Sequence, residues 1–231
     1  MKAMKNMALV QAEFDRIALH SSRNSDERWN HNTHYHRFLL DHVPAGCKSA
    51  LDLGCGTGAF ARLLAQRAEH VLALDLSPQM IHQAQTRSAD VPNIDFQVAD
   101  AFVWECAPEQ FDYIVSIAAL QHLPMEEVLS KLKRGLTPGG SLVILDIYQT
   151  RFSDLFVNLA AVPANVFLQR LKNGHRPPVS PEARAAMAEH IAHDSYLTLA
   201  QVHHLAQVML PGAQVRRHLF WRYSLVWKKA S

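Results

Sequence analysis

Short apolar segments alternate with amphipathic stretches between residues 46 and 150. Five segments are dominated by apolar residues, as is typical of strands buried in a sheet: residues 50–53, 71–75, 94–100, 111–117 and 141–147. Between them, apolar residues recur at helical spacing. Strands that alternate with helices predict an α/β fold, a doubly wound and mostly parallel sheet covered on both faces.

The pattern changes after residue 150. Residues 151–195 contain no expected strand but two expected helices, one of them interrupted at Pro163. A helix is expected from Leu199 to Met209. Two short apolar runs follow, Gln214–Phe220 and Tyr223–Lys229, and the chain between them is too short for a crossover helix. They must therefore pair antiparallel as a hairpin.

Composition and charge describe an ordinary globular chain. The 231 residues are 48% hydrophobic and 19% charged, with a net charge of +2 and scattered basic residues. These values do not favour a nucleic-acid partner or an anionic membrane surface. No apolar run approaches the roughly 18 residues that span a bilayer, and the three cysteines form no C-x-x-C motif. We therefore expect a reduced, cytoplasmic protein.

A glycine-rich loop follows the first predicted strand, in the stretch Leu51-Asp52-Leu53-Gly54-Cys55-Gly56-Thr57-Gly58. A strand, a tight glycine loop and a helix N-terminus form a recurrent site for nucleotide-containing ligands. Asp52 at the end of the strand would oppose the pyrophosphate of a dinucleotide, but it would attract a ligand with an ammonium and a sulfonium. S-adenosylmethionine is such a ligand.

This stretch resembles motif I of the class I S-adenosylmethionine-dependent methyltransferases. The resemblance implies a seven-stranded Rossmann-like sheet, whose antiparallel C-terminal hairpin would distinguish it from a dinucleotide domain with a parallel sixth strand. One domain, residues 1–231, would then contain four parts. These are N-terminal cap helices (1–45), a cofactor-binding core (46–150), a helical lid insertion after the fifth strand (151–197), and a final helix with the hairpin (198–231).

The residues expected to bind the cofactor lie mostly at strand ends. Asp52 and the loop residues Gly54, Cys55 and Gly56 form the first group. Asp75 ends the second strand, 17 residues after Gly58, where a carboxylate can accept both ribose hydroxyls. Leu76 and Met80, beside Asp75, are expected to flank the adenine, although Met80 is equally plausible as a core residue. The resemblance implies that Asp100 and Ala101 contact the adenine, that Ile117 faces the methionine part, and that Tyr35 lies near the methionine carboxylate.

Two histidines are candidate general bases. His122 follows the fourth strand and His36 lies in the helix before the first, and each can equally be a packing residue. Three aromatic residues are expected to line an apolar acceptor pocket: Tyr148, Phe152 and Phe156. A lid would also exclude water, although residues 151–197 could instead cover the core or form a dimer face. His31, His34 and His36 lack a carboxylate or cysteine to complete a metal site, so no metal is expected.

Methyl transfer to an oxygen, nitrogen or carbon atom of a small-molecule acceptor is the function predicted from these features. An NAD(P)-dependent oxidoreductase and a non-catalytic cofactor-binding partner protein are the alternatives. The expected ligands are S-adenosylmethionine, its product S-adenosylhomocysteine and the acceptor, with neither nucleic acid nor membrane as a partner. The chain is expected to be a monomer or a homodimer.

Overall fold

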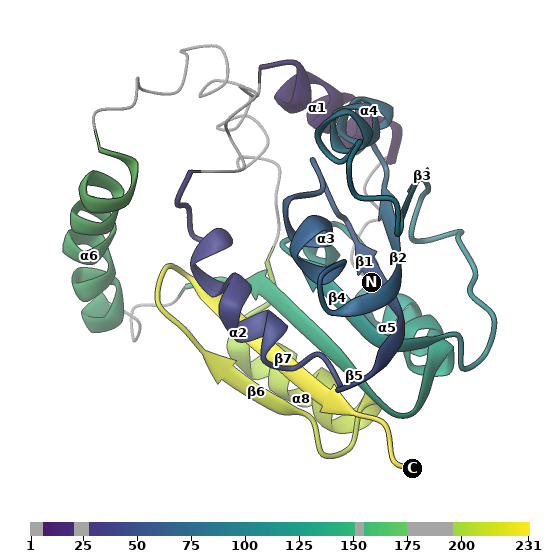
Figure 1. The fold of residues 1–231 in the computed structure, drawn as a ribbon. Coiled ribbons are helices and arrows are strands. Elements are labelled where there is room, and N and C mark those ends of the chain that lie inside the picture. Colours follow the sequence, from purple (N-terminus) through teal and green to yellow (C-terminus); the bar gives the residue numbers. More distant parts are fainter. Residues whose placement is uncertain (1–6, 21–27, 151–154, 175–195) are drawn as a thin grey trace.

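The computed structural model describes residues 7–20, 28–150, 155–174 and 196–231. They form a three-layered α/β fold around one sheet (Figure 1). The second helix expected between residues 151 and 195 lies outside the described residues.

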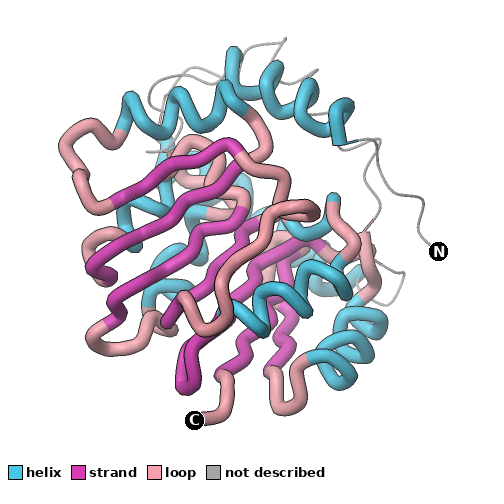
Figure 2. Tube along the Cα trace, turned by 90° about the vertical axis from the view of Figure 1, so that its right-hand side faces the viewer, coloured by secondary structure: helices cyan, strands magenta, loops and turns pink. Residues whose placement is uncertain are grey.

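Seven strands form one sheet in the order β3-β2-β1-β4-β5-β7-β6. The first five strands are parallel, and β7 lies antiparallel between β5 and β6, as the hairpin prediction required. Figure 2 shows them as one continuous twisted sheet with helices on either side. The strands are β1 (Cys47–Leu53), β2 (Ala68–Asp75), β3 (Ile94–Val98), β4 (Phe111–Ile117), β5 (Leu136–Ile147), β6 (Gln214–Arg217) and β7 (Arg222–Lys228).

Helices cover both faces of the sheet because neighbouring strand residues point to opposite faces. Ile114 packs in the cluster under α5 (Met125–Gly135) and α8 (Leu199–Met209), whereas Val115 packs in the other cluster. That second cluster lies under α2 (His36–Leu40), α3 (Ala59–Leu64) and α4 (Pro78–Arg87). Two short 3-10 helices, η1 (Thr33–Tyr35) and η2 (Leu120–His122), precede α2 and α5.

Two helices lie outside these layers. The first, α1 (Met7–His20), packs on α4, and Figure 1 shows the two at the same end of the molecule. The second, α6 (Leu155–Asn173), stands at the left of Figure 1. It packs partly on the second cluster through Ala161, which is 1% exposed. Most of the other apolar side chains described on α6 are exposed, among them Leu159, Phe167 and Leu171.

Helix and strand ends mostly follow local sequence signals. Ser77 caps α4 by accepting a hydrogen bond from the Met80 N–H, and Pro78 occupies the first helical position. The fifth strand begins at Leu136, earlier than the expected start at residue 141, and Gly139 within it has a φ of +77°. The residues between Leu136 and Ser141 form a bulge in β5, because Phe111 of β4 pairs with Leu136 but Tyr113 pairs with Ser141. The expected interruption of the helix at Pro163 is wrong, because α6 continues through this residue. Proline lacks a backbone N–H, which removes only one hydrogen bond of the helix.

Replacing Gly54 by alanine should destabilise the fold more than replacing Gly46. Both glycines have positive φ, +79° and +67°, so both variants carry backbone strain. A Cβ on Gly54 would also lie 2.3 Å from the Ala119 Cβ, whereas nothing lies within 4 Å of a Cβ on Gly46. We expect urea denaturation to give a further loss of about 1–3 kcal/mol in the free energy of unfolding for Gly54→Ala. Equal losses would mean that Ala119 moves aside freely.

Candidate active site

A cavity of about 360 Å³ lies at the carboxyl ends of β1, β2 and β4. The strand order reverses between β1 and β4, and this switch point is where α/β sheets bind ligands. The glycine loop after β1 forms the inner wall. Helix α1 and residues 28–36, which we call the cap segment, complete the outer wall.

The glycine loop is fixed to the second strand by backbone hydrogen bonds. The N–H groups of Gly54 and Cys55 both donate to the Leu74 carbonyl, at 2.8 and 2.9 Å. The Gly56 N–H donates to Asp75 Oδ2 at 2.8 Å. Gly54, Cys55 and Gly56, which the sequence proposed for the cofactor, all line the cavity.

Asp75 lies at the end of β2 and lines the cavity. Its Oδ1 accepts a hydrogen bond from the Ser77 N–H at 2.9 Å, while its Oδ2 is held by Gly56. Burial raises the pKa of this carboxyl, and the two N–H donors partly offset that rise. Each oxygen keeps a further lone pair, so the side chain is oriented and can still accept hydroxyl donors.

Asp52 supplies a second carboxyl, which is only 1% exposed. Among the described residues, no donor reaches its Oδ2. Burial, together with the charge of Asp75, raises the pKa of Asp52 to about 7. A cationic ligand would supply the missing partner, whereas a pyrophosphate would be repelled. The ammonium and sulfonium of S-adenosylmethionine therefore fit this end of the cavity.

Leu76, Met80 and Ala101 line the cavity beyond Asp75, and their predicted contacts with adenine stay predictions. Asp100 is outside the lining; its Oδ1 accepts a hydrogen bond from the Phe102 N–H at 2.8 Å. This carboxylate stabilises the turn after β3, and its predicted contact with adenine stays a prediction.

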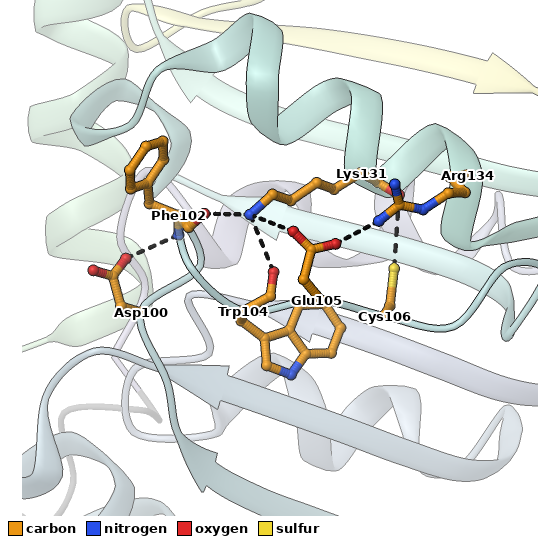
Figure 3. Close-up of polar contacts among 7 residues, drawn as sticks. All are labelled: Asp100, Phe102, Trp104, Glu105, Cys106, Lys131 and Arg134. Atoms are coloured by element: carbon orange, nitrogen blue, oxygen red, sulfur yellow. Dashed lines mark hydrogen bonds and ion pairs between the residues drawn. The ribbon is translucent and has the colours of Figure 1, made fainter.

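The loop after β3 is fastened to α5, as Figure 3 shows. Lys131 donates to the carbonyls of Phe102 and Trp104, and it lies 3.1 Å from a carboxylate oxygen of Glu105. Arg134 pairs with the same carboxylate. These contacts hold the neighbouring residue Ala101 at the cavity.

The floor beside β4 is apolar. Ile117, which we expected to face the methionine part, lines the cavity together with Ala118, Ala119 and Leu123. Ala118 has a φ of +52°, which is uncommon for a residue with a Cβ. Its N–H donates to the Leu145 carbonyl at 2.8 Å, so β5 holds this strained position.

Sequence reasoning missed the contribution of α1. Met7, Val10 and Phe14 of this helix line the cavity, and Asp15 accepts hydrogen bonds from the Ser77 hydroxyl and the Gln79 N–H. The spacing of Val10 and Phe14 was the available signal, since residues four apart share a helix face. Nothing in that spacing indicated which surface the face would cover.

The two candidate bases, His36 and His122, and the predicted carboxylate contact, Tyr35, differ in their positions relative to the cavity. His36 lines the cavity, with its ring centroid 5.2 Å from that of Phe60. His122 ends η2, and its side chain is outside the description. Tyr35 is not in the lining, contrary to expectation, because its ring packs in the second core cluster and its hydroxyl donates to the Leu219 carbonyl.

The expected acceptor residues do not gather at the cavity. Tyr148 is 2% exposed and packs in the cluster under α5 and α8, so it is not in the lining. Phe156 lies in α6 with its side chain outside the description, and Phe152 lies outside the described residues. No described residue of α6 lines the cavity. Among the described residues, no group of histidine, cysteine or carboxylate side chains could hold a metal ion.

Comparisons with known proteins agree with this geometry. A family model described as "Methyltransferase domain" matches residues 50–140. An uncharacterized methyltransferase of Mycobacterium tuberculosis is 32% identical over 209 residues, covering 88% of this chain and 98% of that protein. The 2-phytyl-1,4-naphtoquinone methyltransferase of Thermosynechococcus vestitus is 33% identical over 156 residues, covering 64% of this chain and 69% of that protein.

A solved structure shares the fold. It is the Haemonchus contortus phosphoethanolamine N-methyltransferase 1 in complex with phosphoethanolamine and S-adenosylhomocysteine, with a TM-score of 0.65 and 16% identity over 100% of this chain and 50% of that one. The seven-stranded sheet with its antiparallel C-terminal strands is that of the class I methyltransferases. The chain belongs to the S-adenosylmethionine-dependent methyltransferases of this class. It is therefore an enzyme, and its membership of a methyltransferase family excludes both the oxidoreductase and the non-catalytic alternative. None of the described helices is both long and apolar enough to cross a membrane.

The raised pKa of Asp52 should make the protein without ligand less stable as the pH rises. Well below pH 4, the carboxyl is neutral in both the folded and the unfolded chain. Between about pH 4 and 7 only the unfolded chain ionises, so the free energy of unfolding falls, and above about pH 7 the loss is complete. From pH 5 to 8 this loss should be about 2–3 kcal/mol.

The measurement is urea denaturation of wild type and Asp52→Asn at pH 5 and pH 8. We expect the variant to gain stability relative to wild type between these two values. Asp95→Asn removes an exposed carboxylate of β3 and should leave the pH dependence as in wild type. A parallel pH dependence in wild type and Asp52→Asn would contradict the raised pKa.

Proposed function

We propose that this methyltransferase acts on a small-molecule acceptor with an apolar part. The observation that carries the proposal is that one chain encloses the cavity: α1 and the cap segment stand opposite the glycine loop and leave about 360 Å³. A volume of this size is typical of small-molecule sites. Met7, Val10, Phe14 and Leu123 make much of its surface apolar.

The relatives support a small-molecule acceptor. One is named for a phytyl naphthoquinone, and the solved neighbour holds phosphoethanolamine beside S-adenosylhomocysteine. These acceptors differ in polarity and in the atom that would be methylated. The apolar lining favours the first kind for this chain.

Asp52 and Asp75 would bind the cofactor from the inner wall, Asp52 at its cationic end and Asp75 at the ribose. S-adenosylmethionine, when bound, would supply a methyl group on a cationic sulfur. The lone pair of the acceptor forms the new bond to the methyl carbon, and the sulfur keeps the electron pair of the broken S–C bond. The chain itself aligns the reactants and excludes water, and alignment alone can lower a barrier by about 7–11 kcal/mol.

A hydroxyl acceptor also has to lose a proton, and His36 is placed to take it. It lines the cavity from the cap side, and histidine is well matched to proton transfer near neutral pH. His122 stays the second candidate. An amine delivered in its neutral form would need neither residue.

The acceptor class can be tested by following labelled methyl groups. The full-length protein is incubated with radiolabelled S-adenosylmethionine and, separately, with hydroquinones, phenols, small amines, tRNA and a denatured protein mixture. We expect label in a small organic product and none above background in the macromolecules. Transfer to RNA or to protein would overturn the proposed acceptor class while leaving the methyltransferase assignment intact.

Replacing His36 should slow turnover of a hydroxyl acceptor without weakening cofactor binding. We expect His36→Gln to lower kcat by about 10²–10⁴-fold and to remove the acidic limb of the pH–rate profile, with little change in the dissociation constant of S-adenosylhomocysteine. His70→Gln changes an exposed histidine of β2 and is the matched control. An unchanged rate and pH profile in His36→Gln would exclude it as the base.

A further inference from the structure

Asn32 of the cap segment is held in one orientation by a buried arginine. Nε and Nη2 of Arg222 donate to the same oxygen, Asn32 Oδ1, at 3.0 and 2.8 Å. The guanidinium has donors only, so the amide oxygen must face it and the amide nitrogen must face away. Arg222 is 8% exposed and is not in the cavity lining, whereas Asn32 is.

The side-chain amide of Asn30 is oriented in the same way as that of Asn32, but by different hydrogen bonds. Its Oδ1 accepts hydrogen bonds from the N–H groups of Asn32 and Thr33, at 2.8 and 3.0 Å. The oxygen is therefore turned into the cap segment itself, which leaves the amide nitrogen to face outward. Asn30 also lines the cavity, so two asparagines can present donors on the same wall.

The charges around the cavity reinforce this arrangement. The carboxyls of Asp52 and Asp75 lie on the inner wall. The positive charge of Arg222 lies behind Asn32. Burial lowers the pKa of Arg222, and the charge of Asp146, a carboxyl only 1% exposed, partly offsets that lowering. The cavity is thus acidic at the glycine loop and rich in hydrogen-bond donors at the cap segment.

We propose that Asn30 and Asn32 form a binding site for an anionic ligand oxygen, with Arg222 as the positioning residue that fixes the amide of Asn32. The chemistry is that of a carboxylate or a deprotonated hydroxyl, which accepts hydrogen bonds from amide donors. Such an oxygen belongs either to the amino-acid end of the cofactor or to the acceptor. Only the case in which the oxygen belongs to the acceptor rests on the proposed small-molecule function.

Asn32→Asp is the sharpest test because it exchanges a donor for an acceptor with almost no change in shape. The carboxylate can still pair with Arg222, so the clamp is kept while the face toward the cavity changes sign. Titration calorimetry would compare S-adenosylhomocysteine with its decarboxylated analogue, S-adenosyl-3-thiopropylamine. If the cofactor carboxylate occupies the site, the affinity for S-adenosylhomocysteine falls at least about tenfold, and the affinity for the analogue does not fall.

The second arm tests the acceptor as the source. Acetate, benzoate and 4-nitrophenolate are titrated into wild type and Asn32→Asp, each saturated with S-adenosylhomocysteine. If the acceptor oxygen occupies the site, S-adenosylhomocysteine binds both proteins equally, and at least one of these anions binds wild type and loses at least about tenfold in affinity in the variant. Neither arm depends on catalytic turnover, so a failure of the proposed acceptor class would not affect the cofactor result.

Three further variants keep the test decisive. Asn30→Asp makes the same exchange at an exposed residue, which covers the case in which Asn32→Asp does not fold. Arg222→Gln should reproduce the loss seen in Asn32→Asp, while Arg216→Gln, at an exposed arginine of β6, should bind as wild type does. The proposal is overturned if folded Asn30→Asp and Asn32→Asp, or the folded one alone, bind S-adenosylhomocysteine and all three anions as wild type does.

Discussion

The hydrogen bond from the Gly56 N–H to Asp75 Oδ2 joins the two strand ends on which the site depends. It requires a loop that folds back from β1 onto β2, which the glycines allow because three of them adopt positive φ. The same bond orients one carboxylate, whose charge in turn helps to raise the pKa of Asp52. The buried carboxyls make this end of the cavity suited to a cationic ligand, so a backbone constraint sets the chemistry of the pocket.

The outer wall depends on contacts between distant parts of the chain. Trp29 exchanges backbone hydrogen bonds with the Asn173 side chain, and His31 lies 3.0 Å from Asn165, so α6 holds the cap segment from outside. The His31 ring stacks on Phe220 with a centroid distance of 4.9 Å. Burial, with the nearby charge of Arg222, lowers the pKa of His31 and favours its neutral form. The segment 151–197 was expected to shape the pocket directly, but its described helix supports the segment that does.

Most of the fold could be predicted because its signals are local. The apolar runs predicted the strands, and the short distance between the last two runs required an antiparallel hairpin. The errors arose where tertiary contacts override a local rule. The fifth strand was expected to begin at residue 141, but Leu136 already pairs with Phe111 of β4. Tyr35 read as a ligand contact, but the Leu219 carbonyl holds its hydroxyl.

The sequence by itself determined the class of fold, the glycine loop and the carboxylates of Asp52 and Asp75, because a strand end and its loop are adjacent in the chain. The tertiary structure alone decided which residues close the cavity. Met7, Phe14 and Asn32 carry no motif, and they reach the site only because α1 packs on α4 and Arg222 of the last strand clamps the cap segment. Such contacts join residues up to 190 positions apart, and spacing along the chain carries no record of them.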